Sequence, residues 1–438
     1  MPTLPARTGP LVGLKVLEIG HYVAAPFCTR ILADLGAEVI KIEPPGGDPF
    51  RGWGAAVDGN SVWFSIHGRN KLSVVLDLKR ERETALKLAA RADVLVENLR
   101  AGQLERLGLG PAELHGVNPR LVIARISGYG QDGPYRDRPA FGAIGEAMGG
   151  LRHLTGHPPG VSDLPPPRCG ISISDDLAGM YAAIGLLAAL WQRDAGGGTI
   201  GGGTVGGGKV GGGKVGGGTV GGGTVGGGTV GGGTVTGGTG RGRVVDVNLV
   251  DSVFSLLEGM LPEYAMDGRV RQPVGAAIPT AAPTNTYRCA DGRFLCIAGN
   301  SDLIFARLMT AIGRAELGKD PGYATNADRC ARREELDAVI GAWAATLPAK
   351  HAEALLEAAD VPCSRLYDVA DCAADPHFLA RGSVQAVDDP LVGRTLHPGP
   401  AIRLDGDRAE DVVAWPGPAV GAHTDYVLGT LLGKGGGA

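Results

Sequence analysis

Short apolar segments alternate with amphipathic helical segments between residues 14 and 130, and this alternation limits the folds open to the chain. Leu14–Gly20 and Glu38–Glu43 are typical of strands, and a loop and an amphipathic helix separate them. Two strands joined by such a helix form a parallel βαβ unit. The pattern continues in Leu72–Lys79, Asp93–Asn98 and Leu121–Gly130. The sequence therefore predicts an α/β fold with a Rossmann-like, doubly wound parallel sheet.

The turn after the first predicted strand argues against a nicotinamide dinucleotide site. It has the sequence GHYVAAPF and lacks the GxGxxG pattern that lets a backbone approach a pyrophosphate. Glu43 closes the second strand, where an acidic residue can bind a ribose, but the following PPGGDP is equally typical of a turn. We do not expect a bound dinucleotide.

A glycine repeat interrupts the chain between Gly196 and Val235. It consists of eight tandem pentapeptides of the form Gly-Gly-Gly-(Thr or Lys)-(Val or Ile). Such a tract buries too little side-chain surface to offset the entropy of ordering its backbone. Phosphate-binding glycine loops are single short turns between a strand and a helix, not tandem arrays. We interpret Gly196–Thr236 as an inert insert within one domain, and a weaker hypothesis is self-association through its regularly spaced valines.

The part of the chain after residue 284 has a different pattern. YRCADGRFLCIAG (Tyr287–Gly299) predicts a hairpin around an Asp-Gly turn. Helical patterns follow in Ser301–Gly313 and Arg333–Leu347, and a terminal helix is expected over His423–Gly433. The predicted organisation is a large α/β domain over 10–284, interrupted by 196–236, a small α+β domain over 285–370, and a return to the large domain over 371–438.

Composition excludes several classes of protein. The 438 residues carry a net charge of −4 and no clustered Lys/Arg face, so nucleic acid is not an expected partner. The seven cysteines have no CxxC spacing, which favours reduced thiols in the cytoplasm, and no spacing of possible ligands predicts a metal site. The N-terminus has no apolar core of a signal peptide, and no 18 consecutive apolar residues predict a membrane span.

Two aspartates precede a long helix of small apolar residues in ISISDDLAGMYAAIGLLAAL (171–190). Ser172 or Ser174 can cap this helix, which places Asp175 or Asp176 in its first turn, where free N–H groups and the helix dipole favour a negative charge. An ionised carboxylate held there can attack a thioester. Ordinary helix capping explains the same residues, and the local sequence leaves both interpretations open.

Taken together, these motifs resemble family III CoA-transferases of the CaiB/BaiF type, the group that contains formyl-CoA transferase. The resemblance covers nearly the whole chain apart from the glycine repeat. It rests on LKVLEIGHYVAAPFCTRILADLGAEVIKIE, RNKLSVVLDLK, DVLVENLRAG, RISGYGQDGPYRD, AMGGLRHLTGHP, SDDLAGMYAAIGLLAAL, RGRVVDVNLVDSVF, DGRFLCIAGN, ADPHFLARG and GAHTDYVL.

The resemblance implies that Asp175, four residues before Gly179, is the nucleophile. Its carboxylate would attack a donor acyl-CoA, and transfer would proceed through aspartyl anhydrides and an aspartyl-CoA thioester. Coenzyme A would then be a substrate, with no permanently bound cofactor. The resemblance also implies an interlocked homodimer.

The coenzyme A contacts of the family map onto this chain unevenly. At Val23, formyl-CoA transferase has a glutamine, and Pro139–Gly142 lacks the charged residues that formyl-CoA transferase has there. Arg106 matches an arginine suited to the phosphates of coenzyme A. The positions that the resemblance assigns to coenzyme A are His21, Val23, Ala24, Leu76, Asp77, Leu78, Lys79, Asn98, Leu99, Arg100 and Arg106.

These departures favour a donor other than formyl-CoA. AMGGLRHLTGHP is closer to members that act on dicarboxylic acids such as succinate, so we expect succinyl-CoA or another dicarboxylyl-CoA as donor, with Arg152, His153 and Arg168 as possible contacts of the acceptor carboxylate. The alternative is a 2-methylacyl-CoA racemase of the same family, which uses a His/Asp pair. Asp137–Arg152 contains no histidine at the racemase position. A third possibility is a catalytically silent coenzyme A-binding protein.

Overall fold

A six-stranded parallel sheet forms the centre of the larger part of the molecule. The computed structural model describes residues 6–195, 239–406 and 412–432. Its strand order is β5-β2-β1-β6-β7-β8, and every neighbouring pair is parallel. This is the order of a Rossmann-type sheet, so the predicted α/β class and parallel sheet are confirmed. The strands are β1 (Lys15–Ile19), β2 (Glu38–Glu43), β5 (Lys71–Val75), β6 (Val94–Glu97), β7 (Val122–Ser127) and β8 (Val244–Asn248).

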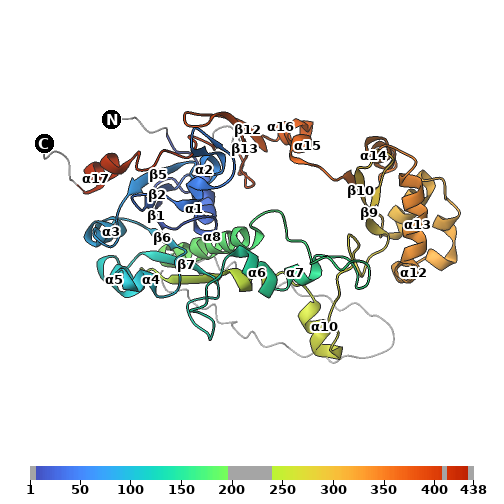
Figure 1. The fold of residues 1–438 in the computed structure, drawn as a ribbon, viewed down its shortest axis with the longest axis horizontal. Helices are drawn as coiled ribbons and strands as arrows, with labels where there is room; N and C mark the ends of the chain where they lie inside the picture. Colours follow the sequence, from blue (N-terminus) through green and yellow to red (C-terminus); the bar gives the residue numbers. More distant parts are fainter. Residues whose placement is uncertain (1–5, 196–238, 407–411, 433–438) are drawn as a thin grey trace, which may run out of the picture.

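Helices cover both faces of this sheet (Figure 1). On one face α1 (Ala24–Asp34) and α8 (Ile173–Asp194) bury a core with the strands, and on the other α3 (Arg82–Ala89), α5 (Pro111–Val117) and α17 (Thr424–Leu432) do the same. Because both faces are covered, the central strands are rich in buried apolar residues, and the charged residues among them, such as Glu18 and Arg125, are paired inside the sheet.

Two predicted strands extend too far. The segment expected as Leu72–Lys79 ends as β5 at Val75, because Asp77 begins a turn in which its side chain accepts from the Lys79 N–H at 3.1 Å. The segment expected to reach Gly130 ends as β7 at Ser127, whose hydroxyl accepts from the Gly130 N–H at 3.0 Å. Side chains that bond nearby backbone groups compete with a strand ladder and end it.

Helix α8 is the element that carries the predicted nucleophile. A cluster of alanines and glycine lets it lie close to α1, since a Cβ on Gly179 would lie 2.8 Å from the Ala24 carbonyl oxygen. Among the described residues, α8 is the one helix whose length and apolar character would suffice to cross a membrane, but half of that stretch is buried. It packs against α1 and β7, as core helices of globular proteins do.

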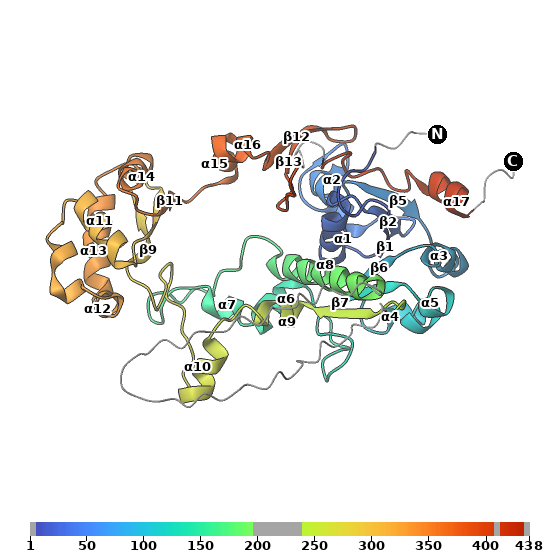
Figure 2. The same cartoon turned by 180° about the vertical axis from the view of Figure 1, so that it is seen from behind.

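A smaller sheet with its own core forms a second part (Figure 2). The predicted hairpin is present as β9 (Thr284–Arg288) and β10 (Phe294–Ala298), and β11 (Cys363–Arg365) extends it to three antiparallel strands. Three helices build a separate apolar cluster with it, α11 (Asp302–Ala311), α13 (Arg333–Ala344) and α14 (Ala349–Ala358), and α12 (Asn326–Ala331) lies next to α13.

Two separate stretches of chain connect the two parts (Figures 1 and 2). The first contains α9 (Leu249–Phe254) and α10 (Met260–Asp267), and the second contains α15 (Val369–Ala374) and α16 (Pro376–Ala380). Two helices that precede α8 in the chain, α6 (Gly142–Met148) and α7 (Leu151–Leu154), lie next to the first stretch, where α6 contacts α9. The remaining short elements are β3 (Ala56–Val57), β4 (Asn60–Ser61), α2 (Val62–His67), α4 (Gln103–Arg106), β12 (Val384–Asp389) and β13 (Gly393–Pro398), with single 3₁₀ turns at Pro49–Gly52, Leu317–Lys319 and Pro321–Tyr323.

The C-terminal residues return to the large sheet. Trp415 donates its indole N–H to the Lys71 carbonyl at 3.0 Å, and the Val75 N–H donates to the Thr424 hydroxyl at 3.0 Å. The edge strand β5 is therefore covered by residues more than 300 positions away in the sequence.

The glycine repeat predicted as an insert lies outside the described residues. The described residues just before and just after the repeat both bind the side chain of Arg120. Arg120 donates to the Asp194 carboxylate at 2.6 Å and to the Gly240 carbonyl at 3.4 Å. The chain therefore leaves α8 and returns toward β8 at nearly the same place.

Candidate functional site

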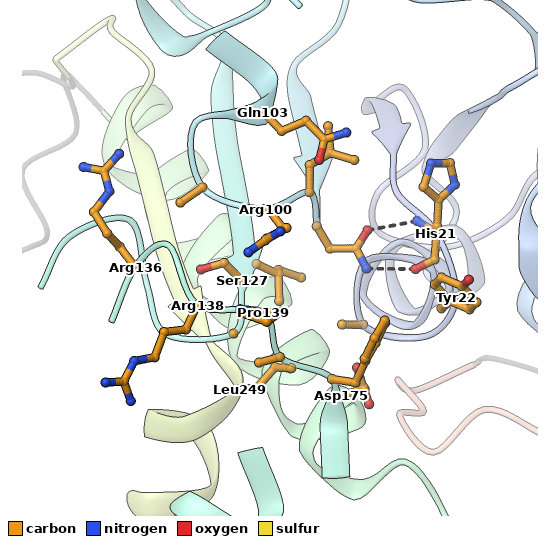
Figure 3. A pocket seen from close by; sticks show the side chains of 18 residues that line it. His21, Tyr22, Arg100, Gln103, Ser127, Arg136, Arg138, Pro139, Asp175 and Leu249 are labelled. Carbon is orange, nitrogen blue, oxygen red and sulfur yellow. Dashed lines mark hydrogen bonds between the residues drawn. The ribbon is translucent and has the colours of Figure 1, made fainter. Parts of the chain in front are cut away.

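The most informative cavity lies where the strand order of the large sheet reverses, between β1 and β6. Its volume is about 290 Å³, and the loops that follow β1, β6 and β7 line it together with the start of α8 (Figure 3). In open parallel sheets ligands bind outside the carboxyl ends of the strands at this reversal. The lining residues are His21, Tyr22, Ala24, Asn98, Leu99, Arg100, Ala101, Gln103, Ile126, Ser127, Gly128, Arg136, Arg138, Pro139, Ala140, Phe141, Asp175 and Leu249.

Asp175 lies in the first turn of α8 and faces this cavity (Figure 3). The helix begins without a side-chain cap: Ser172 occupies the N-cap position but makes no cap hydrogen bond, and Ser174 instead donates to the Leu249 carbonyl at 3.1 Å. The expectation that a serine side chain caps the helix is therefore wrong.

The surroundings of Asp175 raise its pKa to about 6. Burial is the larger cause, and the neighbouring carboxylate of Asp176 adds to it, while the charge of Arg168 opposes it. The pKa of Asp176 is also raised to about 6, because burial outweighs the charge of Arg30. A carboxylate with a raised pKa is more basic than an ordinary aspartate and is still largely ionised near pH 7.

Gly142 provides the space that the carboxylate of Asp175 occupies. A Cβ built on Gly142 would overlap Oδ2 of Asp175. Gly142 opens helix α6, and the next turn of that helix lies equally close to α8, since a Cβ on Gly145 would overlap the hydroxyl oxygen of Ser174. Two glycines one turn apart thus let α6 lie directly against the first turn of α8.

The loop after β1 is held by Asn98 at the end of β6. The His21 N–H donates to Oδ1 of Asn98 at 2.9 Å, and Nδ2 of Asn98 donates to the His21 carbonyl at 2.8 Å. These two bonds join the two strands at the reversal point (Figure 3). The imidazole of His21 points away from Asp175, and burial lowers its pKa. This geometry gives His21 a backbone role in shaping the cavity.

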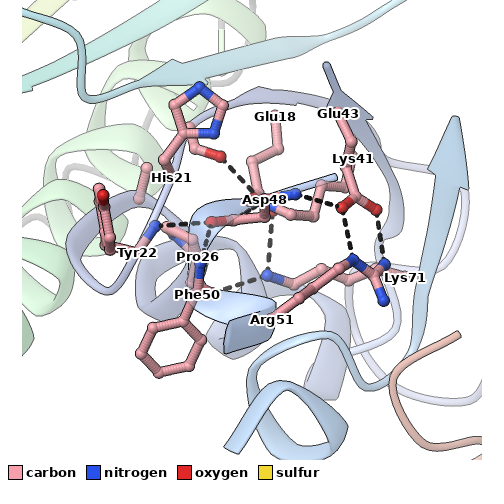
Figure 4. A network of polar contacts seen from close by, with 12 residues as sticks. Glu18, His21, Tyr22, Pro26, Lys41, Glu43, Asp48, Phe50, Arg51 and Lys71 are labelled. Atoms are coloured by element: carbon pink, nitrogen blue, oxygen red, sulfur yellow. Dashed lines mark hydrogen bonds and ion pairs between the residues drawn. The ribbon is translucent and has the colours of Figure 1, made fainter. Parts of the chain in front are cut away.

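A buried network of charged side chains lies next to the loop after β1 and contacts it (Figure 4). Glu18 binds Lys41 at 2.6 Å and Lys71 at 3.0 Å, and Lys41 also binds Asp48 at 2.7 Å. Burial would raise the pKa of Glu18, but the two lysines outweigh it and lower the pKa to about 2. Buried charges of this kind are tolerated when they are paired and hydrogen-bonded.

Asp48 connects this network to Tyr22, because it binds both Lys41 and the Tyr22 N–H. The Tyr22 N–H donates to Oδ1 of Asp48 at 3.1 Å, and Tyr22 has a left-handed backbone with φ of 63°. Side chains disfavour this conformation by about 1–3 kcal/mol, so surrounding contacts must hold it. The Tyr22 ring packs on Trp53 with ring centres 5.3 Å apart. Strain of this kind beside a cavity is a signature of functional sites.

The cavity brings together only some of the residues expected to bind coenzyme A. His21, Ala24, Asn98, Leu99 and Arg100 line it with Asp175. The side chain of Val23 is buried against Phe50 and Phe64, and Arg106 is exposed beside Gly102.

The stretch Leu76–Lys79 follows β5 and does not line the cavity. Leu76 is buried in the core of the sheet, and Leu78 packs against that core. Asp77 forms the turn described above, and Lys79 is exposed. These residues lie at the same carboxyl edge of the sheet as the cavity, but β5 is two strands away from β1, the nearer strand that borders the cavity.

Sequence reasoning missed Arg136 and Arg138. Both are exposed on the loop after β7 and line the cavity across from His21 and Tyr22 (Figure 3). With Arg100 they give the lining three arginines, while the Arg138 guanidinium lies over the Tyr135 ring at 3.6 Å and Nε of Arg136 lies 3.7 Å from the Asp137 carboxylate. Their position after a predicted strand could have indicated them, because the carboxyl ends of parallel strands share one edge. Positive charge absent from Pro139–Gly142 is thus supplied by neighbouring residues.

Comparison with known proteins agrees with this geometry. The chain matches CoA-transferase family III over residues 11–205 and 222–424. It is 40% identical to succinyl-CoA–D-citramalate CoA-transferase of Chloroflexus aurantiacus, over 97% of this chain and 94% of the relative. It is 31% identical to succinyl-CoA:glutarate CoA-transferase of Mus musculus, over 97% and 86%. A crystal structure of a CaiB/BaiF family protein from Brucella suis superposes with a TM-score of 0.75 at 30% identity, covering 97% of this chain and 99% of the other.

The fold is doubly wound, a carboxylate lies where the strand order reverses, and the sequence matches one protein family along nearly its whole length. These three observations define the class of the protein. The chain belongs to CoA-transferase family III. It is a CoA-transferase, as the resemblance in its sequence predicted.

Proposed function

We propose that this enzyme transfers coenzyme A from succinyl-CoA or another dicarboxylyl-CoA to a carboxylic acid, with Asp175 as the nucleophile. The observation that carries this proposal is the carboxylate of Asp175 facing the cavity at the sheet reversal, with its pKa raised to about 6. The names of the relatives, which act from succinyl-CoA on D-citramalate and glutarate, support the substrate class.

The reaction divides into four displacements that balance without an added proton or cofactor. The Asp175 carboxylate attacks the thioester carbonyl, which forms an anhydride and releases the coenzyme A thiolate. The thiolate attacks the aspartyl carbonyl and expels the donor acid, leaving an aspartyl-CoA thioester. The acceptor carboxylate attacks that thioester, which forms a second anhydride and releases the thiolate again. The thiolate finally attacks the acceptor carbonyl and frees Asp175.

Coenzyme A would lie along the carboxyl edge of the sheet with its thioester at Asp175. Arg100, Arg136 and Arg138 supply exposed guanidinium groups for its phosphates, which such groups bind through paired hydrogen bonds. Leu76–Lys79 and Arg106 remain proposed contacts for parts of the molecule outside the cavity, and Val23 would contribute its backbone. We propose no permanently bound cofactor or metal.

Trapping the covalent intermediate tests the proposal. The enzyme is incubated with succinyl-CoA and a panel of acids, treated with hydroxylamine or borohydride, and the mass of the peptide that contains Asp175 is measured. We expect an adduct on Asp175 in the native enzyme, and Asp175→Ala should abolish turnover while coenzyme A still binds. Substantial transfer by Asp175→Ala would contradict the assignment. Deuterium incorporation at the α-carbon without an adduct would favour the racemase alternative.

We also propose the homodimer and the domain division expected from the sequence, with a large domain from 10–284 and 371–438 and a small domain over 285–370. Ile184 and Trp191 on α8 are 63% and 66% exposed in the single chain, an apolar surface that a second copy would cover. The two connecting stretches form an open ring that an interlocked partner could thread (Figure 1). The mass of the protein in solution tests the dimer.

We also propose a cytoplasmic location, which the seven free cysteines support.

A further inference from the structure

A buried glutamate holds two arginines close to Asp175. Glu146 lies on α6, the helix that begins against the carboxylate of Asp175, and is 1% exposed. It accepts a hydrogen bond from the Cys169 N–H at 3.2 Å. Its two carboxylate oxygens lie 3.8 Å from Nη1 of Arg152 and 3.9 Å from Nε of Arg168. The buried carboxylate therefore attracts both guanidinium groups at ion-pair distance.

Each arginine keeps donors free after these contacts. Arg152 donates from Nε to the Pro166 carbonyl at 3.2 Å, and Arg168 donates from Nη2 to the Ile171 carbonyl at 3.0 Å. A guanidinium has five N–H donors, so each contact leaves several available. The side chains are 32% and 48% exposed, which leaves them accessible to a ligand.

The charges in this cluster do not balance. Two guanidinium groups face one buried carboxylate, which leaves one positive charge for a ligand to neutralise. The cluster adjoins Asp175 through α6, because Glu146 lies one turn after Gly142, where a Cβ would overlap Oδ2 of Asp175, and the segment of Arg168 leads directly into α8. His153 is not part of it, because its ring nitrogen Nε2 contacts the Arg271 carbonyl at 3.1 Å.

We propose that Arg152 and Arg168, held by Glu146, bind the distal carboxylate of the dicarboxylic acyl group. This inference rests on the proposed function and adds a selectivity device to it. A bidentate guanidinium–carboxylate pair recognises one end of the acyl group while the thioester at the other end meets Asp175. Glu146 acts as a positioning residue, and the two arginines act as the carboxylate-binding residues.

Selectivity between two donors of equal chain length tests this site. Succinyl-CoA and butyryl-CoA differ only in a terminal carboxylate against a methyl group. We expect Arg168→Gln and Arg152→Gln each to lower kcat/KM for succinyl-CoA by about 10- to 100-fold, the value of a hydrogen bond to a charged group, with little change for butyryl-CoA. Arg168→Lys, which keeps the charge, should retain part of the preference. The matched control is Arg314→Gln, an exposed arginine paired with Glu316 in the small part.

Glu146→Gln distinguishes positioning from structure. It should reduce the ratio of succinyl-CoA to butyryl-CoA activity through a higher KM, whereas a merely structural role would lower both activities together. An unchanged ratio in both arginine variants, or an equal loss for both donors with the fold intact by circular dichroism, would overturn the proposed carboxylate site. The adduct on Asp175 of the native enzyme reports separately on the proposed function, so the two proposals can fail independently.

Discussion

At the scale of single residues, Asp175 combines two opposing requirements. As the proposed nucleophile it must be ionised to attack a thioester, yet burial and Asp176 raise its pKa to about 6. Because this pKa lies above the unfolded value of 3.8, the folded chain binds the proton more tightly, and stability falls as the pH rises through the window between 3.8 and about 6. At neutral pH the ionised nucleophile therefore reduces stability, which is common for groups that serve catalysis.

The pH dependence of the reaction should report this titration. We expect kcat/KM to fall as the pH is lowered through about 6, because only the carboxylate attacks and kcat/KM reports the free enzyme. Asp176→Asn removes the neighbouring negative charge and should move the midpoint of the pH profile to lower pH. Asp163→Asn, which changes an exposed acid on a loop, is the control and should leave the midpoint in place. A midpoint unaffected by Asp176→Asn would mean that burial alone sets the pKa.

Gly142→Ala should impair the enzyme without unfolding it. The added methyl group would occupy the position of Oδ2 of Asp175, so the carboxylate must rotate away from the cavity. Misplacing a reacting group by about 1 Å can lower rates about 100-fold, and we expect a loss in kcat of this order. Steady-state kinetics with thermal unfolding measure both effects. Gly116→Ala, at a glycine of α5 whose Cβ would meet open space, is the control. Full activity in Gly142→Ala would show that the carboxylate has another productive position.

At the scale of elements, the strands that carry the site were predictable and part of its chemistry was not. Strands β1, β2 and β6 are short and rich in Val, Leu and Ile, so they were recognisable from sequence despite the charged residues that they bury. Arg136 and Arg138 depend on the path of a loop, and Glu146 sits in a helix sequence where an acid is typical of the surface. Its burial follows from packing between α6 and the segment around Cys169, which no local pattern encodes.

The charge network under β1 should contribute strongly to stability. Glu18→Gln leaves Lys41 and Lys71 without their shared carboxylate in a buried setting, and we expect a loss of about 3–5 kcal/mol in the free energy of unfolding. The pKa of Glu18 is lowered from 4.5 to about 2, so its contribution is present above pH 4.5 and is lost as the pH falls toward 2. Urea denaturation measures the loss. The exposed Glu83→Gln is the control, and equal stabilities for the two variants would contradict the network's role.

At the scale of the whole molecule, the glycine repeat lies between two segments of the large part whose described ends are close to one another. Arg120 binds Asp194 before the repeat and Gly240 after it, and α8 and β8 both belong to the large sheet and its helical layer. The match to the family likewise leaves out residues 206–221. The residues proposed for catalysis and coenzyme A binding all lie outside the repeat.

Replacing residues 196–238 with a Gly/Ser linker of about six residues should preserve both activity and fold, since two chain ends held by one guanidinium are within reach of such a linker. Transfer assays and the mass in solution are the measurements, and the full-length chain is the control. Loss of activity with the large sheet intact would show that the repeat takes part in function. Dissociation of the assembly alone would support self-association through its valines.

The separation between buried and exposed charge gives the site an uneven response to ionic strength. Glu18, Lys41 and Asp48 are removed from solvent, so dissolved ions screen their attraction weakly, and the loop at His21 keeps its shape in concentrated salt. Arg100, Arg136 and Arg138 are exposed, and counterions compete directly for them. If these arginines bind the coenzyme A phosphates as proposed, added salt should weaken substrate binding and leave the loop at His21 unchanged.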